Sequence, residues 1–178
     1  ILRLKFRLGL FDDPYGLAGN YEKFACPEYV NSAYRAAVEG EVLLKNENSI
    51  LPLSKDTRIL LVGPNANSMR TLGGGWNYSW QGDQAENPKY TGQYNTIYEA
   101  LKSKFKNVEY LPVLNYASHA HFETEERGDF SKAVRAARNA DVIVAAIGEN
   151  SYCETVGNIN DISLSQNQRD LVKELART

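Results

Sequence analysis

Three features that mark common protein classes are missing from the sequence. Its 178 residues contain no apolar run close to the roughly 18 residues that span a membrane, so we expect no membrane segment. The formal net charge is -2, from 20 basic and 22 acidic residues, which argues against the clustered basic excess of a nucleic-acid-binding surface. No signal peptide opens the sequence, which starts at Ile1 in an amphipathic segment, so we expect a piece of a longer protein.

Cysteine and histidine are also scarce, with two residues of each type. A structural metal site needs about four ligands, and Cys26 and Cys153 lie far apart in the sequence, so we expect two free thiols. His119 and His121 are separated by one residue in a predicted loop, which is not a specific metal-binding spacing, so we expect both histidines to be solvated. The sequence has no CxxC pair and no Ser-His-Asp order. We therefore expect neither a metal nor another cofactor.

From residue 58 onward, strand patterns alternate with helical patterns. Strands are predicted at 58–62, 107–113 and 141–147, and helices at 96–105, 129–139 and 165–177, the last with Ser165 as its N-cap. This alternation is typical of an α/β fold in which helices cover both faces of a parallel sheet, a flavodoxin-like three-layer sandwich. The sequence stops after a helix, where a further strand would be due, so we expect the sandwich to be incomplete at its C-terminus.

The N-terminal part divides into a lead-in or linker at 1–27 and the start of a domain that covers 28–178. The pattern of residues 1–11 fits a strand and also one face of a helix. Residues 28–45 are predicted to form a helix. Its apolar stripe, which we expect to be buried, consists of Val30, Ala33, Tyr34, Ala37 and Leu44.

The loop at 148–161 follows the apolar run 141–147 and carries two carboxylates, Glu149 and Glu154. In an open parallel sheet, ligands bind just outside the carboxyl ends of the strands. A carboxyl group held there against an apolar wall can act as a proton donor. The alternative is an exposed loop with two solvated glutamates.

The loop after residue 62 is expected to open on the same edge of the sheet and to run to about residue 92. It is rich in glycine but lacks the G-x-G-x-x-G fingerprint and the P-loop lysine, which argues against a nucleotide or flavin domain. Both tryptophans of the sequence, Trp76 and Trp80, lie in it. Trp76 follows three glycines, so its indole either stacks on the apolar face of a sugar or caps the core. For Trp80 we expect a core cap.

An ordered set of motifs resembles the C-terminal sandwich domain of glycoside hydrolase family three, the family of exo-acting β-glucosidases and their relatives. The motifs are LGLFDDPY at 8–15, VLLKN at 42–46, LPL at 51–53, ILLVGP at 59–64, GGW at 74–76, WQG at 80–82, GENSYCE at 148–154 and the stretch 161–168. Each motif alone is weak, but together they cover nearly the whole sequence in the order of the family.

The resemblance implies a retaining exo-acting β-glycosidase, in the first instance a β-glucosidase, that removes terminal β-linked sugars. In that family a (β/α)8 barrel domain supplies the nucleophilic aspartate, and residues 1–27 resemble the end of the barrel region. The sandwich supplies the acid/base, which matches Glu154, with Glu149 as the fallback, while Trp76 matches one side of an aromatic substrate clamp. With Glu154 as the acid/base, Glu149 is expected to anchor the loop by hydrogen bonds to backbone N–H groups. The fragment alone would then be inactive, and the parent enzyme periplasmic or secreted. The alternatives are a β-xylosidase of the same family and a non-catalytic carbohydrate-binding domain.

Overall fold

The computed structural model describes residues 1–15, 21–89, 91–118 and 120–178. It divides the chain into two compact units, Ile1–Leu51 and Pro52–Thr178. The predicted domain boundary after residue 27 stays a prediction. The expectation that His119 is solvated lies outside the described residues.

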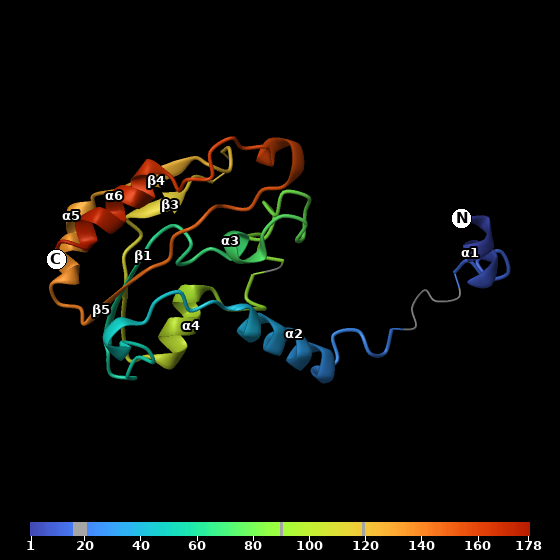
Figure 1. The fold of residues 1–178 in the computed structure, drawn as a ribbon, viewed down its shortest axis with the longest axis horizontal. Coiled ribbons are helices and arrows are strands. Elements are labelled where there is room, and N and C mark those ends of the chain that lie inside the picture. Colours follow the sequence, from blue (N-terminus) through green and yellow to red (C-terminus); the bar gives the residue numbers. More distant parts are fainter. Residues whose placement is uncertain (16–20, 90, 119) are drawn as a thin grey trace. The chain divides into compact units, whose positions relative to one another are not determined.

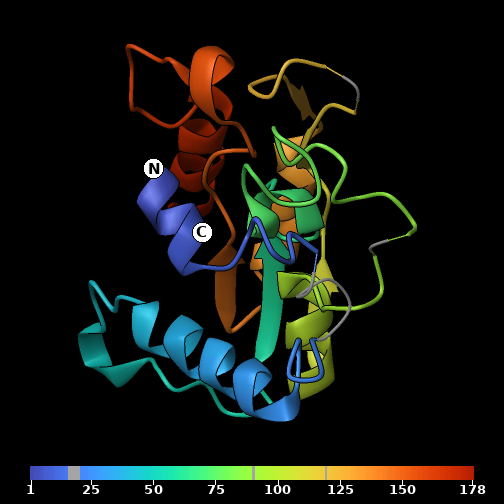
Figure 2. The same ribbon diagram turned by 90° about the vertical axis from the view of Figure 1, so that its right-hand side faces the viewer.

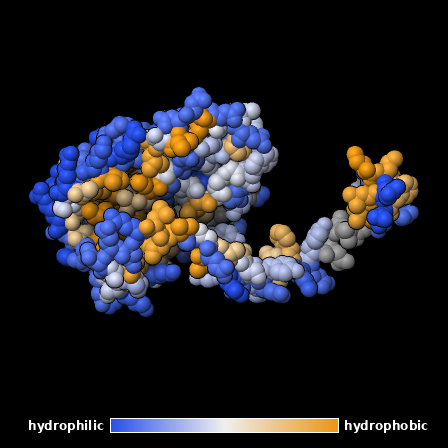
Figure 3. Space-filling model, viewed as in Figure 1, coloured by the Kyte–Doolittle hydropathy of each residue, from blue (hydrophilic) through white to orange (hydrophobic). Residues whose placement is uncertain are grey.

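The first unit consists of the helices α1 (Leu2–Arg7) and α2 (Pro27–Gly40) and the short 3-10 helix η1 (Glu47–Ser49). α1 resolves the ambiguity of the N-terminal pattern in favour of a helix. α2 ends at Gly40, five residues before the predicted end, because Glu41 adopts an extended backbone conformation. Figure 3 shows apolar side chains gathered over α1.

The predicted buried stripe of α2 is wrong for this unit. Val30, Tyr34 and Leu44 are exposed, and α2 has no buried residue. The apolar spacing is helical, as predicted, but within the described part of this unit nothing packs on that side of the helix. Leu44 also lies beyond the end of α2.

The second unit is built on a parallel sheet of three strands in the order β2-β1-β5. The strands are β1 (Arg58–Val62), β2 (Asn107–Tyr110) and β5 (Val142–Ala145), and β1 pairs in parallel with both neighbours. The predicted α/β fold with a parallel sheet is therefore confirmed. β1 is the central strand, so both of its faces are covered. This explains why Ile59–Val62 are all apolar and all buried, with no alternation of polar and apolar residues.

Helices cover both faces of this sheet (Figure 1). They are α4 (Ile97–Lys104), α5 (Phe130–Ala137) and α6 (Gln166–Leu175). Leu60 and Val62 face α5 and α6 and share one core with Phe130, Leu171 and Leu175. α4 lies on the other face, where the Tyr98 ring packs against that of Tyr110 at 5.0 Å.

Side-chain caps define where these helices begin. Ser165 accepts a hydrogen bond from the backbone N–H of Gln168, which confirms the predicted N-cap of α6. Thr96 and Glu99 form a reciprocal capping box at α4, and Asp129 caps α5. Within the described residues, no helix is long and apolar enough to cross a membrane.

The helix α3 and the strands β3 and β4 were not predicted. The long loop after β1 contains a short helix, α3 (Met69–Gly73), capped by Ser68. The segment that was predicted as a loop before α5 contains an antiparallel pair, β3 (Leu114–Tyr116) and β4 (Glu125–Arg127). All three are short, and the β3–β4 pair depends on tertiary contacts, since Leu114 is fully buried in the core with α5 and α6. β2 correspondingly ends at Tyr110 rather than at residue 113.

Candidate active site

The loops after β1 and β5 lie at the same end of the sheet, as expected for two parallel strands (Figure 2). Gly63 makes the turn that ends β1. Its φ angle is +102°, and a Cβ at this position would lie 2.3 Å from the carbonyl oxygen of Ala146. Only glycine lets the ends of β1 and β5 approach this closely.

Glu154 begins the 3-10 helix η2 (Glu154–Gly157) in the loop after β5. Its backbone is left-handed, with a φ angle of +46°, which is uncommon for a residue with a side chain and costs about 1–3 kcal/mol. The side chain is exposed. Among the described residues, its carboxylate has no hydrogen-bond or ion-pair partner. The loop after β5 therefore exposes this carboxylate to solvent at the edge of the sheet.

Glu149 is engaged within the same loop. Its carboxylate accepts a hydrogen bond of 2.9 Å from the hydroxyl of Tyr152, and this bond raises the pKa of Tyr152. The Tyr152 ring in turn packs against Phe122 at 4.4 Å. We expected Glu149 to accept hydrogen bonds from backbone N–H groups. Among the described residues, its partner is the Tyr152 hydroxyl instead. The two glutamates therefore differ: one is bound within the loop and the other is not.

Trp76 and Trp80 form the two ends of a tight turn in the loop after β1. The N–H of Trp76 donates to the carbonyl of Trp80 at 2.8 Å, and the two ring centroids lie 6.4 Å apart. Trp76 has a positive φ angle of 58°, and its side chain is 69% exposed. Trp80 is 45% exposed, so the predicted core cap is wrong. The four-residue spacing of the two tryptophans could have indicated this shared surface in the sequence, because a tight turn brings such positions together.

The two loops touch directly beside these side chains. A Cβ at Gly75 would lie 2.7 Å from the Tyr152 carbonyl oxygen and 2.9 Å from the Cys153 Cβ, so a larger residue would separate the loops. The Cys153 thiol donates to the Trp80 carbonyl at 2.8 Å. Trp76 and Glu154 each follow directly after one of the residues in contact. The structure thus brings the backbones of the two predicted site residues together, across 78 positions of sequence.

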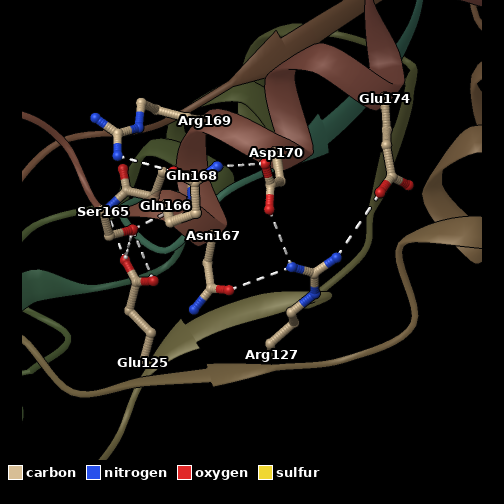
Figure 4. A network of polar contacts seen from close by, with 9 residues as sticks. All are labelled: Glu125, Arg127, Ser165, Gln166, Asn167, Gln168, Arg169, Asp170 and Glu174. Atoms are coloured by element: carbon tan, nitrogen blue, oxygen red, sulfur yellow. Dashed lines mark hydrogen bonds and ion pairs between the residues drawn. The ribbon is translucent and has the colours of Figure 1, made fainter.

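A buried network holds the base of the loop after β5. The amide of Gln168, on α6, bonds to both the N–H and the carbonyl of Gly148, at 2.9 and 2.8 Å. Glu125 accepts bonds from Ser165 and from Gln168, and Figure 4 shows how these side chains meet between β4 and α6. Tyr116 donates to the Gly148 carbonyl at 2.6 Å, and burial raises its pKa to about 12.

Neither Trp76 nor Glu154 lines the cavity of about 910 Å³ at this end of the sheet. That cavity lies between the loop after β1 and the segment that connects β3 and β4, and its wall includes the polar side chains of Arg70, Glu86 and Ser151. Both candidate residues instead lie on an open surface.

Both cysteines are free, as expected. Within the residues that the structure describes, no group of three or more His, Cys, Asp or Glu side chains is arranged to hold a metal ion.

The chain is similar to known proteins of one family. The family description "Glycosyl hydrolase family 3 C-terminal domain" matches residues 41–178. The chain is 34% identical to a lysosomal beta glucosidase of Dictyostelium discoideum and 30% identical to a beta-xylosidase of Formosa agariphila. All of this chain is covered in both cases, but it spans only 22% and 24% of those proteins.

The fold also matches a solved relative. The structure of a beta-glucosidase from Listeria innocua in complex with gluconolactone superposes with a TM-score of 0.73 at 32% identity. The match covers 99% of this chain and 22% of that protein. The resemblance drawn from the motifs is thereby confirmed.

Proposed function

Because the chain belongs to glycosyl hydrolase family 3, we propose that it is part of a retaining, exo-acting β-glycosidase that removes terminal β-linked sugars. The observation that carries the proposal is the juxtaposition at the edge of the sheet. Glu154, whose carboxylate has no partner among the described residues, follows Cys153, which contacts Gly75, and the exposed indole of Trp76 follows Gly75.

Glu154 is the acid/base in this proposal. Retaining glycosidases use two carboxyl groups about 5–5.5 Å apart on either side of the glycosidic bond. Protonated Glu154 gives its proton to the glycosidic oxygen while the nucleophile attacks the anomeric carbon, and the alcohol leaves. Glu154, now a carboxylate, then takes a proton from the water that breaks the glycosyl-enzyme bond. The nucleophile regains its charge, and Glu154 regains its proton.

The second carboxylate and the rest of the sugar site come from a barrel domain of the same enzyme. The open surface on which Glu154 and Trp76 lie supports this part of the proposal, and so does the small share of its relatives that the chain covers. The exposed apolar side chains of the first unit, Phe6, Val30 and Tyr34 among them, offer further surface for such a domain.

The indole of Trp76 forms one side of the substrate site. An exposed aromatic ring provides a flat apolar surface for the C–H face of a sugar, and its neighbour Trp80 extends that surface. A β-glucoside or β-linked oligosaccharide is the substrate class that we favour. A β-xyloside is the second candidate, because one of the similar proteins is named a beta-xylosidase.

A periplasmic or secreted location completes the proposal. It rests on the names of two similar proteins, a periplasmic beta-glucosidase of Salmonella typhimurium and the lysosomal beta glucosidase of Dictyostelium discoideum.

The test is Glu154→Gln in the longer enzyme that contains this chain. We expect kcat/KM for β-glucosides with poor leaving groups to fall by about 10²–10⁴, the usual contribution of a general acid, because protonation of the departing oxygen is lost. Activated aryl glucosides need little protonation, so their cleavage should fall far less, and azide should replace the base-assisted water in the second step. Glu149→Gln is the matched control, since its amide oxygen can still accept from Tyr152.

Equal losses for both substrate types, without azide rescue, would contradict the assignment. A leaving-group-dependent loss in Glu149→Gln alone would move the role to Glu149. The 178-residue chain by itself should show no turnover, because it holds only one of the two carboxylates. A non-catalytic carbohydrate-binding domain would instead bind β-glucosides through Trp76 while neither glutamate affected hydrolysis.

A further inference from the structure

The residue directly before Glu154 is held by a side chain from the other loop. Gln81 lies in the loop after β1, immediately after Trp80, and its amide makes two hydrogen bonds to the backbone of Cys153. The amide N–H donates to the Cys153 carbonyl at 2.8 Å, and the amide oxygen accepts from the Cys153 N–H at 2.8 Å. Gln81 therefore bonds to Cys153 as a neighbouring strand would, across 72 positions of sequence.

The same arrangement occurs at the other end of the segment. Gln168 bonds to the N–H and the carbonyl of Gly148 in the same two-bond manner. Between the two ends, the guanidinium of Arg70 donates to the hydroxyl and the carbonyl of Ser151, at 2.7 and 3.2 Å. Residues 148–153 are thus held at both ends and in the middle, and Glu154 is the first residue beyond the last of these contacts.

The position of Gln81 also couples two parts of the candidate site. Trp76 bonds to Trp80 through its backbone, the Trp80 carbonyl accepts from the Cys153 thiol, and Gln81 follows Trp80 in the chain. Displacement of Cys153 would therefore move Glu154 relative to the indole pair. A general acid must meet its oxygen within hydrogen-bond reach, and misplacement by about 1 Å can cost about 100-fold in rate.

We propose that Gln81 is a positioning residue for Glu154, which sets the place of the acid/base relative to the tryptophan turn. This inference rests on the proposed function of Glu154. The amide is required because both bonds must form at once. A carboxylate accepts from the Cys153 N–H but cannot donate to its carbonyl, and an apolar side chain of the same length does neither.

The experiment is Gln81→Met in the longer enzyme that contains this chain, since methionine keeps the length of the side chain and removes both bonds. The readout is kcat/KM for a series of β-glucosides whose leaving alcohols become less acidic. We expect a loss of about 10-fold or more for an alkyl glucoside and about 2-fold or less for an activated aryl glucoside, because only the former depends on precise proton transfer. Gln81→Glu, which keeps one bond, should fall between Gln81→Met and the wild type.

Gln84→Met is the matched control. Gln84 lies in the same loop and is exposed, and its side-chain amide bonds to the neighbouring Asp83. It should keep the leaving-group dependence of the wild type. Should Gln81→Met fail to fold, Gln81→Glu carries the same comparison, with thermal unfolding recorded to confirm that it is folded at the assay temperature.

The outcomes separate the two proposals. If Glu154→Gln shows the leaving-group-dependent loss and folded Gln81 variants lose activity equally on all substrates, the positioning role is refuted and the acid/base assignment stands. If Glu154→Gln shows no such dependence, the acid/base assignment itself is refuted. A graded dependence, weakest in the wild type, intermediate in Gln81→Glu and strongest in Gln81→Met, supports the positioning role.

Discussion

Gln168→Leu removes the buried amide that holds Gly148 while nearly preserving the volume of the side chain. Gln168 is only 2% exposed, and its Nε2 group has three acceptors within reach: the Gly148 carbonyl, the Glu125 carboxylate and the Tyr116 hydroxyl, at 2.8, 2.8 and 3.1 Å. Its oxygen is the acceptor for the Gly148 N–H at 2.9 Å. Leucine can replace none of these contacts.

The loss of stability depends on which hydrogen-bond partners of Gln168 keep another bond in the variant. The Gly148 carbonyl still accepts from Tyr116, and Glu125 still accepts from Ser165, so neither is left without a donor. The Gly148 N–H loses its acceptor, which costs about 1–2 kcal/mol for a half-buried group, and the lost bond to Glu125 adds about 1 kcal/mol. We expect Gln168→Leu to lower the free energy of unfolding by about 2–3 kcal/mol.

Urea denaturation of the chain, followed by far-UV circular dichroism, measures this difference. Gln166→Leu is the control on the same helix: Gln166 is exposed and, among the described residues, bonds only to its helix neighbours Asp170 and Arg169. It should change the free energy of unfolding by about 0.5 kcal/mol or less. If Gln168→Leu costs no more than Gln166→Leu, the network does not hold the loop after β5, and the reasoning is wrong.

Two further predictions concern the opposite end of the sheet and the tryptophan turn. The Arg58 guanidinium lowers the pKa of Asp141 from 3.8 to about 2, so their interaction stabilises the fold above pH about 4 and is lost as the pH falls toward about 2. Asp141→Asn should therefore lower stability at neutral pH and flatten its acid dependence between about pH 4 and 2, measured by urea unfolding across that range. Trp76→Ala in the longer enzyme should weaken binding of a β-glucoside by about 1 kcal/mol, roughly fivefold in Kd, measured by inhibition with a substrate analogue. An unchanged Kd would remove Trp76 from the substrate site.

Much of the fold was readable from local patterns. The continuous apolar runs at 58–62 and 141–147 predicted buried parallel strands, and both form, because a strand covered on two faces needs apolar side chains at every position. Ser165 predicted the start of α6 because a cap depends only on the next three residues. The ordered motifs also identified the family, since they retain its residue types at its spacing.

The sequence proposed residues for the candidate site but not how they are assembled. Glu154 and Trp76 were singled out from the loops that follow two parallel strands. Their juxtaposition depends on Gly75 and on contacts between segments more than 70 positions apart, which no local period encodes. The exposure of Trp80 was missed for the same reason, because its turn is closed by Trp76 and held by Cys153.

The sequence by itself determined the alternation of β1, α4, β2, α5, β5 and α6, the helix cap at Ser165 and the family, because each depends on residue type and short-range spacing. Only the tertiary structure decided that Glu149 is bound to Tyr152 while Glu154 is left exposed. It also decided that Gln81 and Gln168 each bond to both backbone groups of a residue in the loop after β5. These pairings exist because the parallel sheet brings the loops after β1 and β5 to one edge, where side chains from distant segments satisfy the backbone groups that the loops leave unpaired.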